Sequence, residues 1–189
     1  METLGVLGVV VLLILFMVGG YISIYNKLVQ KRTYVEEAYS QIDVQLHRRN
    51  DLIPNLVSTV KGYAAHESET LEAVIKARQQ LISLPTDATP EQVNALSQQL
   101  SGSLSRLLAV SESYPELKAN ENFLRLQEQL VGTEDKIAVT RSLYNSSVTT
   151  YNLAIQTVPN NIVAGIGKFE KKALLEAPQE ARVAPTVQF

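Results

Sequence analysis

A long apolar stretch at the N-terminus restricts where this chain can reside. No charged side chain occurs between Thr3 and Asn26. As a helix, the segment from Leu4 to Tyr25 would measure roughly 33 Å, slightly more than the roughly 30 Å hydrocarbon core of a bilayer. A backbone in lipid must satisfy its own hydrogen bonds, so the segment is predicted to be a transmembrane helix.

A cleaved signal peptide is the alternative interpretation of the same stretch. Glu2 stands where a signal peptide carries its basic region, and no A-x-A cleavage site follows, so a membrane anchor is favoured. Lys27, Lys31 and Arg32 follow the stretch, whereas no Lys or Arg precedes it. The positive-inside rule therefore predicts a single-pass protein with its C-terminal body in the cytoplasm.

After residue 26, apolar residues recur at the spacing of amphipathic helices. One helix is predicted from the membrane to about Ser83, either kinked at Pro54 or restarted there with Asn50 or Asp51 as N-cap. Thr89, Pro90 and Gln92 form a capping box that predicts the start of a second helix. The last predicted helix, which Pro159 ends, has a seven-residue repeat of Phe123, Leu130, Ile137, Tyr144, Tyr151 and Val158.

These patterns predict an all-α fold, with an N-terminal transmembrane helix followed by an elongated antiparallel bundle of three to four long helices. Residues 1–26 are assigned to the anchor and 27–169 to the bundle. Residues 170–189 are predicted to be a disordered tail, because their last part has two prolines and no apolar period.

Composition argues against several classes of function. The 17 basic and 19 acidic residues give a net charge of −2, which argues against a nucleic-acid partner. The absence of Cys excludes disulfides, a thiol nucleophile and Cys-ligated metals. His47 and His66 are too far apart for a zinc-protease motif, and no phosphate-binding or nucleophile motif occurs. The chain is therefore predicted to be no enzyme and to need no cofactor.

Two local patterns provide the candidate interaction or structural residues. Arg48, Arg49, Asp51 and Pro54 combine charge and a proline within a helix. They indicate either a kink whose freed carbonyl is met by Arg or Asn, or a partner-binding surface.

Asn145 and Asn152 each follow a tyrosine of the heptad repeat. They are predicted to fix the register of helix packing, with ligand recognition as the alternative. Arg141 is predicted to contact Glu134 or Asp135 two turns away, as a structural pair.

Three co-linear stretches resemble the LemA family. They are QLHRRNDLIPNLVSTVKGYAAHE (45–67), YPELKANENFLRLQEQL (114–130) and GTEDKIAVTRSLYNSSVTTYN (132–152), with Pro159 shortly after. The resemblance runs from the transmembrane helix to about residue 170. It implies a bacterial inner-membrane anchor, a short external N-terminus and an all-α bundle without established enzymatic activity. Gly20-Tyr21-Ile22 stands where some members carry a lipid-attachment Cys, so the lipoprotein form does not apply.

The resemblance also links the chain to relatives associated with magnetosome membranes, envelope stress and membrane proteases. Together with the helical pattern it predicts a non-enzymatic, membrane-anchored scaffold that forms homo-oligomers and organises a membrane patch or envelope complex. The alternative is an adaptor or sensor that binds one specific membrane protein. The expected partners are the lipid bilayer, further copies of the chain and a membrane protein, with no nucleic acid.

Overall fold

A computed structural model describes residues 2–176, with side chains from residue 7 onward. The all-α prediction is confirmed, since this part of the chain contains helices and connections and no strand. The elements are α1 (Glu2–Tyr63), α2 (Ser68–Ile82), α3 (Pro90–Val110), the 3-10 turn η1 (Ser111–Ser113), α4 (Pro115–Lys118), α5 (Glu121–Gln156) and α6 (Asn160–Ile166).

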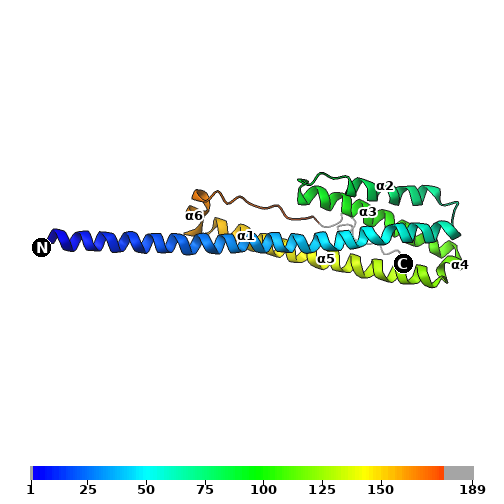
Figure 1. The fold of residues 1–189 in the computed structure, drawn as a ribbon, viewed down its shortest axis with the longest axis horizontal. Helices are drawn as coiled ribbons and strands as arrows, with labels where there is room; N and C mark the ends of the chain where they lie inside the picture. The colour runs from blue at the N-terminus through cyan, green and yellow to red at the C-terminus, as the bar shows by residue number, and fades with distance from the viewer. Residues whose placement is uncertain (1, 177–189) are drawn as a thin grey trace, which may run out of the picture.

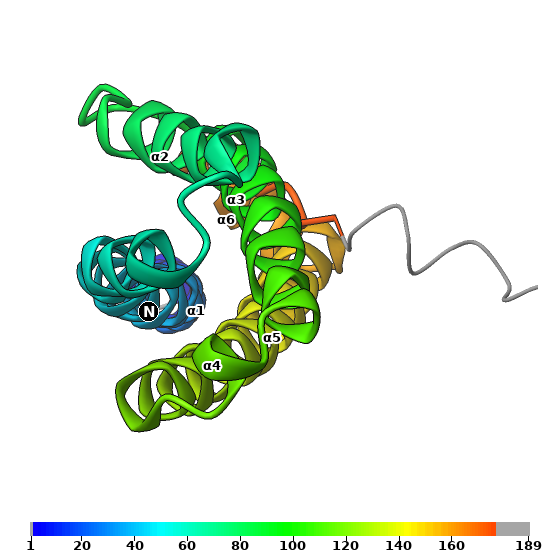
Figure 2. The ribbon, with the colours of Figure 1, turned by 90° about the vertical axis from the view of Figure 1, so that its right-hand side faces the viewer.

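The bundle is elongated, and α1 is its axis. Figure 1 shows α5 returning along α1, while the α2–α3 hairpin covers only the far end. Viewed along the long axis, α2, α3 and α5 form an arc around α1 (Figure 2). The first part of α1 extends alone beyond the other helices (Figure 1). That part is long and apolar enough to cross a membrane.

Helix α1 runs through Pro54 without a break and ends at Tyr63. Of the two alternatives at Pro54, the restarted helix is therefore wrong. The prediction of one helix to about Ser83 is wrong as well. Gly62 weakens the last turn of α1, and the chain reverses before Ser68 to begin α2. The reversal resets the helical phase, so Ile75 and Ile82, which continued the pattern of α1, are exposed.

Side-chain caps mark the starts of the two later long helices, α3 and α5. At α3, the Gln92 amide donates to Thr89 Oγ1 and the Thr89 amide donates to Gln92 Oε1, which completes the predicted capping box. At α5, the Phe123 amide donates to Asn120 Oδ1. The heptad repeat of α5 is buried at its first five positions. Val158 is 78% exposed, because α5 ends two residues earlier.

The chain continues after α6 as an extended segment, residues 169–176, which we call the strap. It runs back along the bundle, with Phe169 and Leu175 buried. The predicted disorder from residue 170 is therefore corrected for 170–176, where apolar side chains and backbone groups find partners on the helices. The rest of that predicted tail, residues 177–189, lies outside the described residues.

Candidate functional site

A polar layer divides the interior of the bundle into two hydrophobic clusters. The membrane-proximal cluster is formed by α1 up to Leu46, the second half of α5, α6 and the strap. The distal cluster is formed by the rest of α1, by α2 and α3, and by the first half of α5. Between them lie the buried or half-buried polar residues Arg49, Ser97, Ser101, Thr133, Glu134 and Arg141.

Arg49 is the centre of this layer, and its side chain is fully buried. One of its terminal nitrogens donates to Glu134 Oε1 at 3.0 Å and to Ser101 Oγ at 2.9 Å. The other donates to Ser97 Oγ at 3.0 Å. A buried charge requires such partners, and they come from α3 and α5. Arg49 therefore ties three helices together.

Arg141 lies beside the same carboxylate. Among the described residues, Arg141 forms neither of the two predicted ion pairs, with Glu134 or with Asp135. Glu134 pairs with Arg49 instead. Burial lowers the pKa of the Arg141 guanidinium, Glu134 raises it, and the charge of Arg49 lowers it. Glu134 and Arg141 line a surface cleft of about 740 Å³ between α3 and α5. Glu134 therefore pairs with Arg49 and acts on Arg141 only through its charge.

The backbone at Pro54 is satisfied from another helix. Pro54 has no amide to donate to the carbonyl of Asn50. Arg78 of α2 donates its Nε to that carbonyl at 3.1 Å. The interpretation of a freed carbonyl met by an arginine thus matches the structure, and the arginine is not one of those near Pro54 in sequence. Arg78 replaces the missing helical hydrogen bond and joins α2 to α1.

Arg78→Met is expected to be costly only while Pro54 is present. In the natural chain it leaves a half-buried carbonyl without a partner, which costs about 1–3 kcal/mol of unfolding free energy. In a Pro54→Ala background the new amide reaches the same carbonyl, so the cost falls. Urea unfolding of the full chain in detergent, monitored by circular dichroism, measures the cost of Arg78→Met in each background. An equal cost in the two backgrounds would contradict this role of Arg78.

The other two candidates near Pro54 lie on the surface. Arg48 and Asp51 are exposed. Asp51 lines a cavity of about 490 Å³ together with His47, Asn50 and Arg78. Of the four candidates here, the structure buries only Arg49, while Arg48, Asp51 and Pro54 are exposed. Pro54 is linked to α2 only through the half-buried carbonyl of Asn50.

Asn145 and Asn152 bind the strap and not a neighbouring helix. Asn145 donates to the carbonyl of Leu175 at 2.9 Å and accepts from the amide of the same residue at 2.8 Å. Asn152 forms the same pair of bonds with Lys172, at 2.8 and 2.9 Å. Their seven-residue spacing puts both on one face of α5. They hold an extended backbone as a neighbouring strand would, so they fix the strap.

The tyrosines before these asparagines hold the same segment. Tyr144 donates its hydroxyl to the carbonyl of Ala173, and Tyr151 to that of Glu170. Burial raises the pKa of both phenols further above neutral pH, where a tyrosine is a protonated donor in any case. The repeated Tyr-Asn pair was the sequence signal for this contact, but its partner, the tail, has no pattern of its own.

Asn145→Asp is expected to release the strap. The substitution replaces an amide donor with a carboxylate that faces the Leu175 carbonyl. Losing this paired contact costs about 1–3 kcal/mol, and 1.4 kcal/mol corresponds to tenfold in the open population. Trypsin should therefore cut after Lys171 or Lys172 about tenfold faster or more. Asn55→Asp, at an exposed position of α1, is the matched control. Equal cleavage rates would rule out this clamp.

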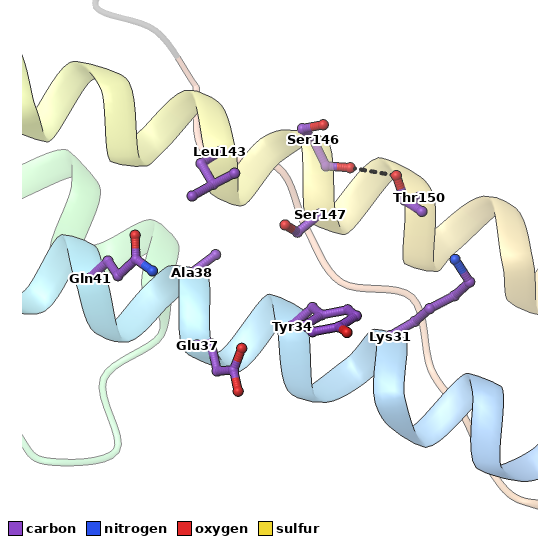
Figure 3. Close-up of a pocket in the computed structure, with 9 residues that line it drawn as sticks. All are labelled: Lys31, Tyr34, Glu37, Ala38, Gln41, Leu143, Ser146, Ser147 and Thr150. Carbon is purple, nitrogen blue, oxygen red and sulfur yellow. Dashed lines mark hydrogen bonds between the residues drawn. The ribbon is translucent and has the colours of Figure 1, made fainter.

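An open groove lies between α1 and α5 in the membrane-proximal half. Its volume is about 310 Å³. Figure 3 shows Tyr34 and Gln41 of α1 facing Leu143 and Ser147 of α5 across it. Tyr34 is 52% exposed and Leu143 47%. Sequence reasoning missed this groove, because it depends on α1 pairing with α5, and no local pattern specifies that pairing.

Among the described residues, no group of three His, Asp or Glu side chains is placed to hold a metal ion. His47 lies 3.6 Å from Asp43 on the surface of α1, and His66 is exposed in the connection after it. The buried guanidinium of Arg49 is engaged with Glu134 and with the hydroxyls of Ser97 and Ser101. These contacts hold α1, α3 and α5 together.

The match to a known family extends over most of the chain. The model of the LemA family matches residues 38–189. This chain belongs to the LemA family. The match begins in the middle of α1, after the apolar stretch, and includes the helices that form the polar layer.

Individual relatives agree with this assignment. Protein LemA of Metamycoplasma hominis is 27% identical over 164 residues, which cover 86% of this chain and 74% of that one. Magnetosome protein MamQ 2 of Paramagnetospirillum magneticum is 27% identical over 170 residues, covering 78% of this chain. Magnetosome protein MamQ of Magnetospirillum gryphiswaldense is 26% identical over the same share. The chain spans 62% of the length of these two magnetosome proteins.

Proposed function

We propose that this LemA-family protein is a non-enzymatic, membrane-anchored helical scaffold that assembles with further copies of itself. The observation that carries the proposal is that one helix of 62 residues is both the apolar stretch and the axis of the bundle. A membrane span and a body that share one helix cannot rotate independently. Such a protein presents its surfaces at a fixed distance along this helix from the membrane.

Support for the anchor comes from exposure as well as from hydropathy. The side chains from Leu7 to Val18 are all exposed, and they are aliphatic or aromatic apart from Gly8 and Met17. Soluble proteins rarely expose a continuous apolar surface of this extent. A lipid bilayer would cover it completely. Lys27, Lys31 and Arg32 favour a cytoplasmic body and an inner-membrane location.

Support for self-association comes from the groove between α1 and α5. Exposed apolar side chains accompany it on α5, namely Val139 at 69%, Leu143 at 47% and Leu153 at 62%. From Ser142 to Gly167 the chain carries no charged residue. Depletion of charge with retained apolar groups is typical of the core of a protein interface. A second copy of the same face is the proposed occupant.

Single-cysteine crosslinking tests the assembly, because the natural chain has no Cys. Leu143→Cys in native membranes should form a disulfide-linked dimer of this chain. Ile75→Cys, similarly exposed on α2, should not. Leu143→Glu should reduce the oligomer measured by mass photometry after detergent extraction, without lowering the melting temperature. A natural chain that is extracted as a monomer or as a one-to-one complex with another protein would favour the adaptor alternative.

The orientation has its own test. Protease added outside intact spheroplasts should leave the body uncut, because the cationic flank keeps it in the cytoplasm. Permeabilised spheroplasts provide the control for protease activity. If the protein in intact spheroplasts is cut down to a membrane-embedded fragment, the assigned orientation is reversed.

A further inference from the structure

The body of the protein begins where α1 leaves the predicted span. From Glu2 to Gly20, about 19 residues of α1 extend free of the bundle, and at 1.5 Å per residue this free part is roughly 28 Å long. That length nearly equals the roughly 30 Å hydrocarbon core of a bilayer. Tyr21 is the first described side chain that is partly buried, and it packs against the membrane-proximal cluster. The part of the body around Tyr21 therefore lies at membrane depth.

The part of the body at this level is the turn between α5 and α6. Tyr25 packs edge-on against Phe169, with ring centroids 5.4 Å apart. A Cβ at Gly167 would lie 2.6 Å from the Phe169 ring and 3.1 Å from the Tyr25 ring, so the chain after α6 is pressed against α1. In Figure 1, α6 is the part of the body nearest the free length of α1. The turn is therefore held rigidly at the edge of the predicted span.

This turn exposes apolar side chains that nothing in the described chain covers. Val158 is 78% exposed, Ile162 62% and Ile166 65%. Their four-residue spacing puts Ile162 and Ile166 on one face of α6. The uncharged stretch from Ser142 to Gly167 ends here. Branched aliphatic side chains are thus exposed at the level where α1 leaves the predicted span.

Cationic residues lie directly next to this apolar surface. Lys168, Lys171 and Lys172 follow α6, with Glu170 as the acidic residue among them. Lys27 and Lys31 are on the adjoining turns of α1, and Arg32 lies over the Phe169 ring at 5.4 Å. An apolar face with a basic border is the pattern of segments that lie in the membrane interface, where lipid phosphates attract the cations.

We propose that the α5–α6 turn is a second membrane contact. Val158, Ile162 and Ile166 enter the interfacial zone of the bilayer that α1 spans, and the lysines after α6 face its phosphates. The inference rests on the membrane anchor of the proposed function. Two separate contacts, one spanning and one interfacial, fix both the rotation and the tilt of the body. A single span would fix neither.

Spin labels on single cysteines test this contact separately from the anchor. The full chain, labelled at Leu12, Ile162 or Ile75, is placed in vesicles of phosphatidylcholine with a phosphatidylglycerol fraction. The accessibility of each label to oxygen and to a water-soluble nickel chelate is then measured. Leu12 should be accessible to oxygen and hardly to nickel, whereas Ile75 should be far more accessible to nickel than Leu12 is. Ile162 should resemble a shallow lipid site, with a nickel accessibility between those two.

The other possible accessibilities of Leu12 and Ile162 would contradict the second contact or the anchor. If Leu12 is in lipid while Ile162 is as nickel-accessible as Ile75, the second contact is wrong and the anchor stands. If Ile162 is shielded from both reagents, protein covers it, and the proposal is equally overturned. If Leu12 is in water, the anchor and the proposed function fail together.

A charge at the neighbouring position supplies an independent check. Ile166→Asp in the chain labelled at Ile162 should abolish the preference of that label for oxygen over nickel, because a carboxylate draws the face into water. Ile75→Asp is the matched control and should leave it unchanged. Both positions are exposed, so the melting temperature should be kept. A label that keeps its lipid signature in the Ile166→Asp chain would contradict the proposal.

Discussion

Leu130→Asp is expected to abolish the cooperative melting of the body. Leu130 is 2% exposed and lies in the distal cluster. The new carboxylate would be buried without a cation one turn away on α5, where the neighbours are Leu126, Gln127, Thr133 and Glu134. A buried unpaired charge costs several kcal/mol, comparable with a whole domain stability of about 5–15 kcal/mol.

Two further variants make this result specific. Val131→Asp, at the next residue and 48% exposed, should melt like the natural chain. Ile137→Asp should be milder than Leu130→Asp although Ile137 is equally buried, because Arg141 lies one turn away and can pair with the new charge. Thermal circular dichroism of the three full-length variants in detergent ranks their melting temperatures. Cooperative melting of Leu130→Asp near the natural temperature would refute the packing of α5 described here.

Glu134→Gln is expected to have the second largest effect. It removes the carboxylate that balances Arg49, whose side chain is fully buried. Breaking a buried ion pair costs about 3–5 kcal/mol, but Glu134 is one-third exposed, so we expect about 2–3 kcal/mol. At about 2–4 °C per kcal/mol, the melting temperature should fall by roughly 5–10 °C.

A double variant without either charge separates the ion pair from simple loss of packing. Arg49→Met with Glu134→Leu removes both charges and keeps apolar volume, so this double variant should be more stable than Glu134→Gln alone. Glu128→Gln, exposed on the same helix, is the control. If Glu134→Gln melts like the control, Arg49 is satisfied by the serines of α3 alone. The polar layer would then not depend on α5.

The sequence was sufficient where structure depends on neighbours along the chain. The capping box at Thr89, the buried repeat from Phe123 to Tyr151 and the apolar first part of α1 follow from local spacing. The end of α1 at Tyr63 does not follow from local spacing, because the apolar phase continues across the reversal. Only the packing of α2 against α3 distinguishes a break at this point from one long helix.

The candidate site was less predictable, because its contacts join distant segments. Arg49 stood out in the sequence, yet its partners Ser97, Ser101 and Glu134 are 48 to 85 residues away. No sequence pattern linked Arg78 of α2 with Pro54 of α1, although the two meet at the Asn50 carbonyl. The asparagines at 145 and 152 were recognised as a pattern, but their partners are backbone groups of the extended strap. A backbone leaves no signature in a sequence.

The pairing of the first long helix with the last has a consequence for synthesis. The buried face of α1, from Leu28 to Val60, finds much of its cover on α5. About 90 residues separate the end of α1 from the end of α5. At about 5–20 residues per second, the ribosome needs roughly 5–20 s to supply them. Throughout that interval a nascent chain has an exposed apolar helix face, whereas the α2–α3 hairpin can form as soon as it emerges. The nascent chain is therefore most exposed to aggregation, and to binding by chaperones, before α5 is complete.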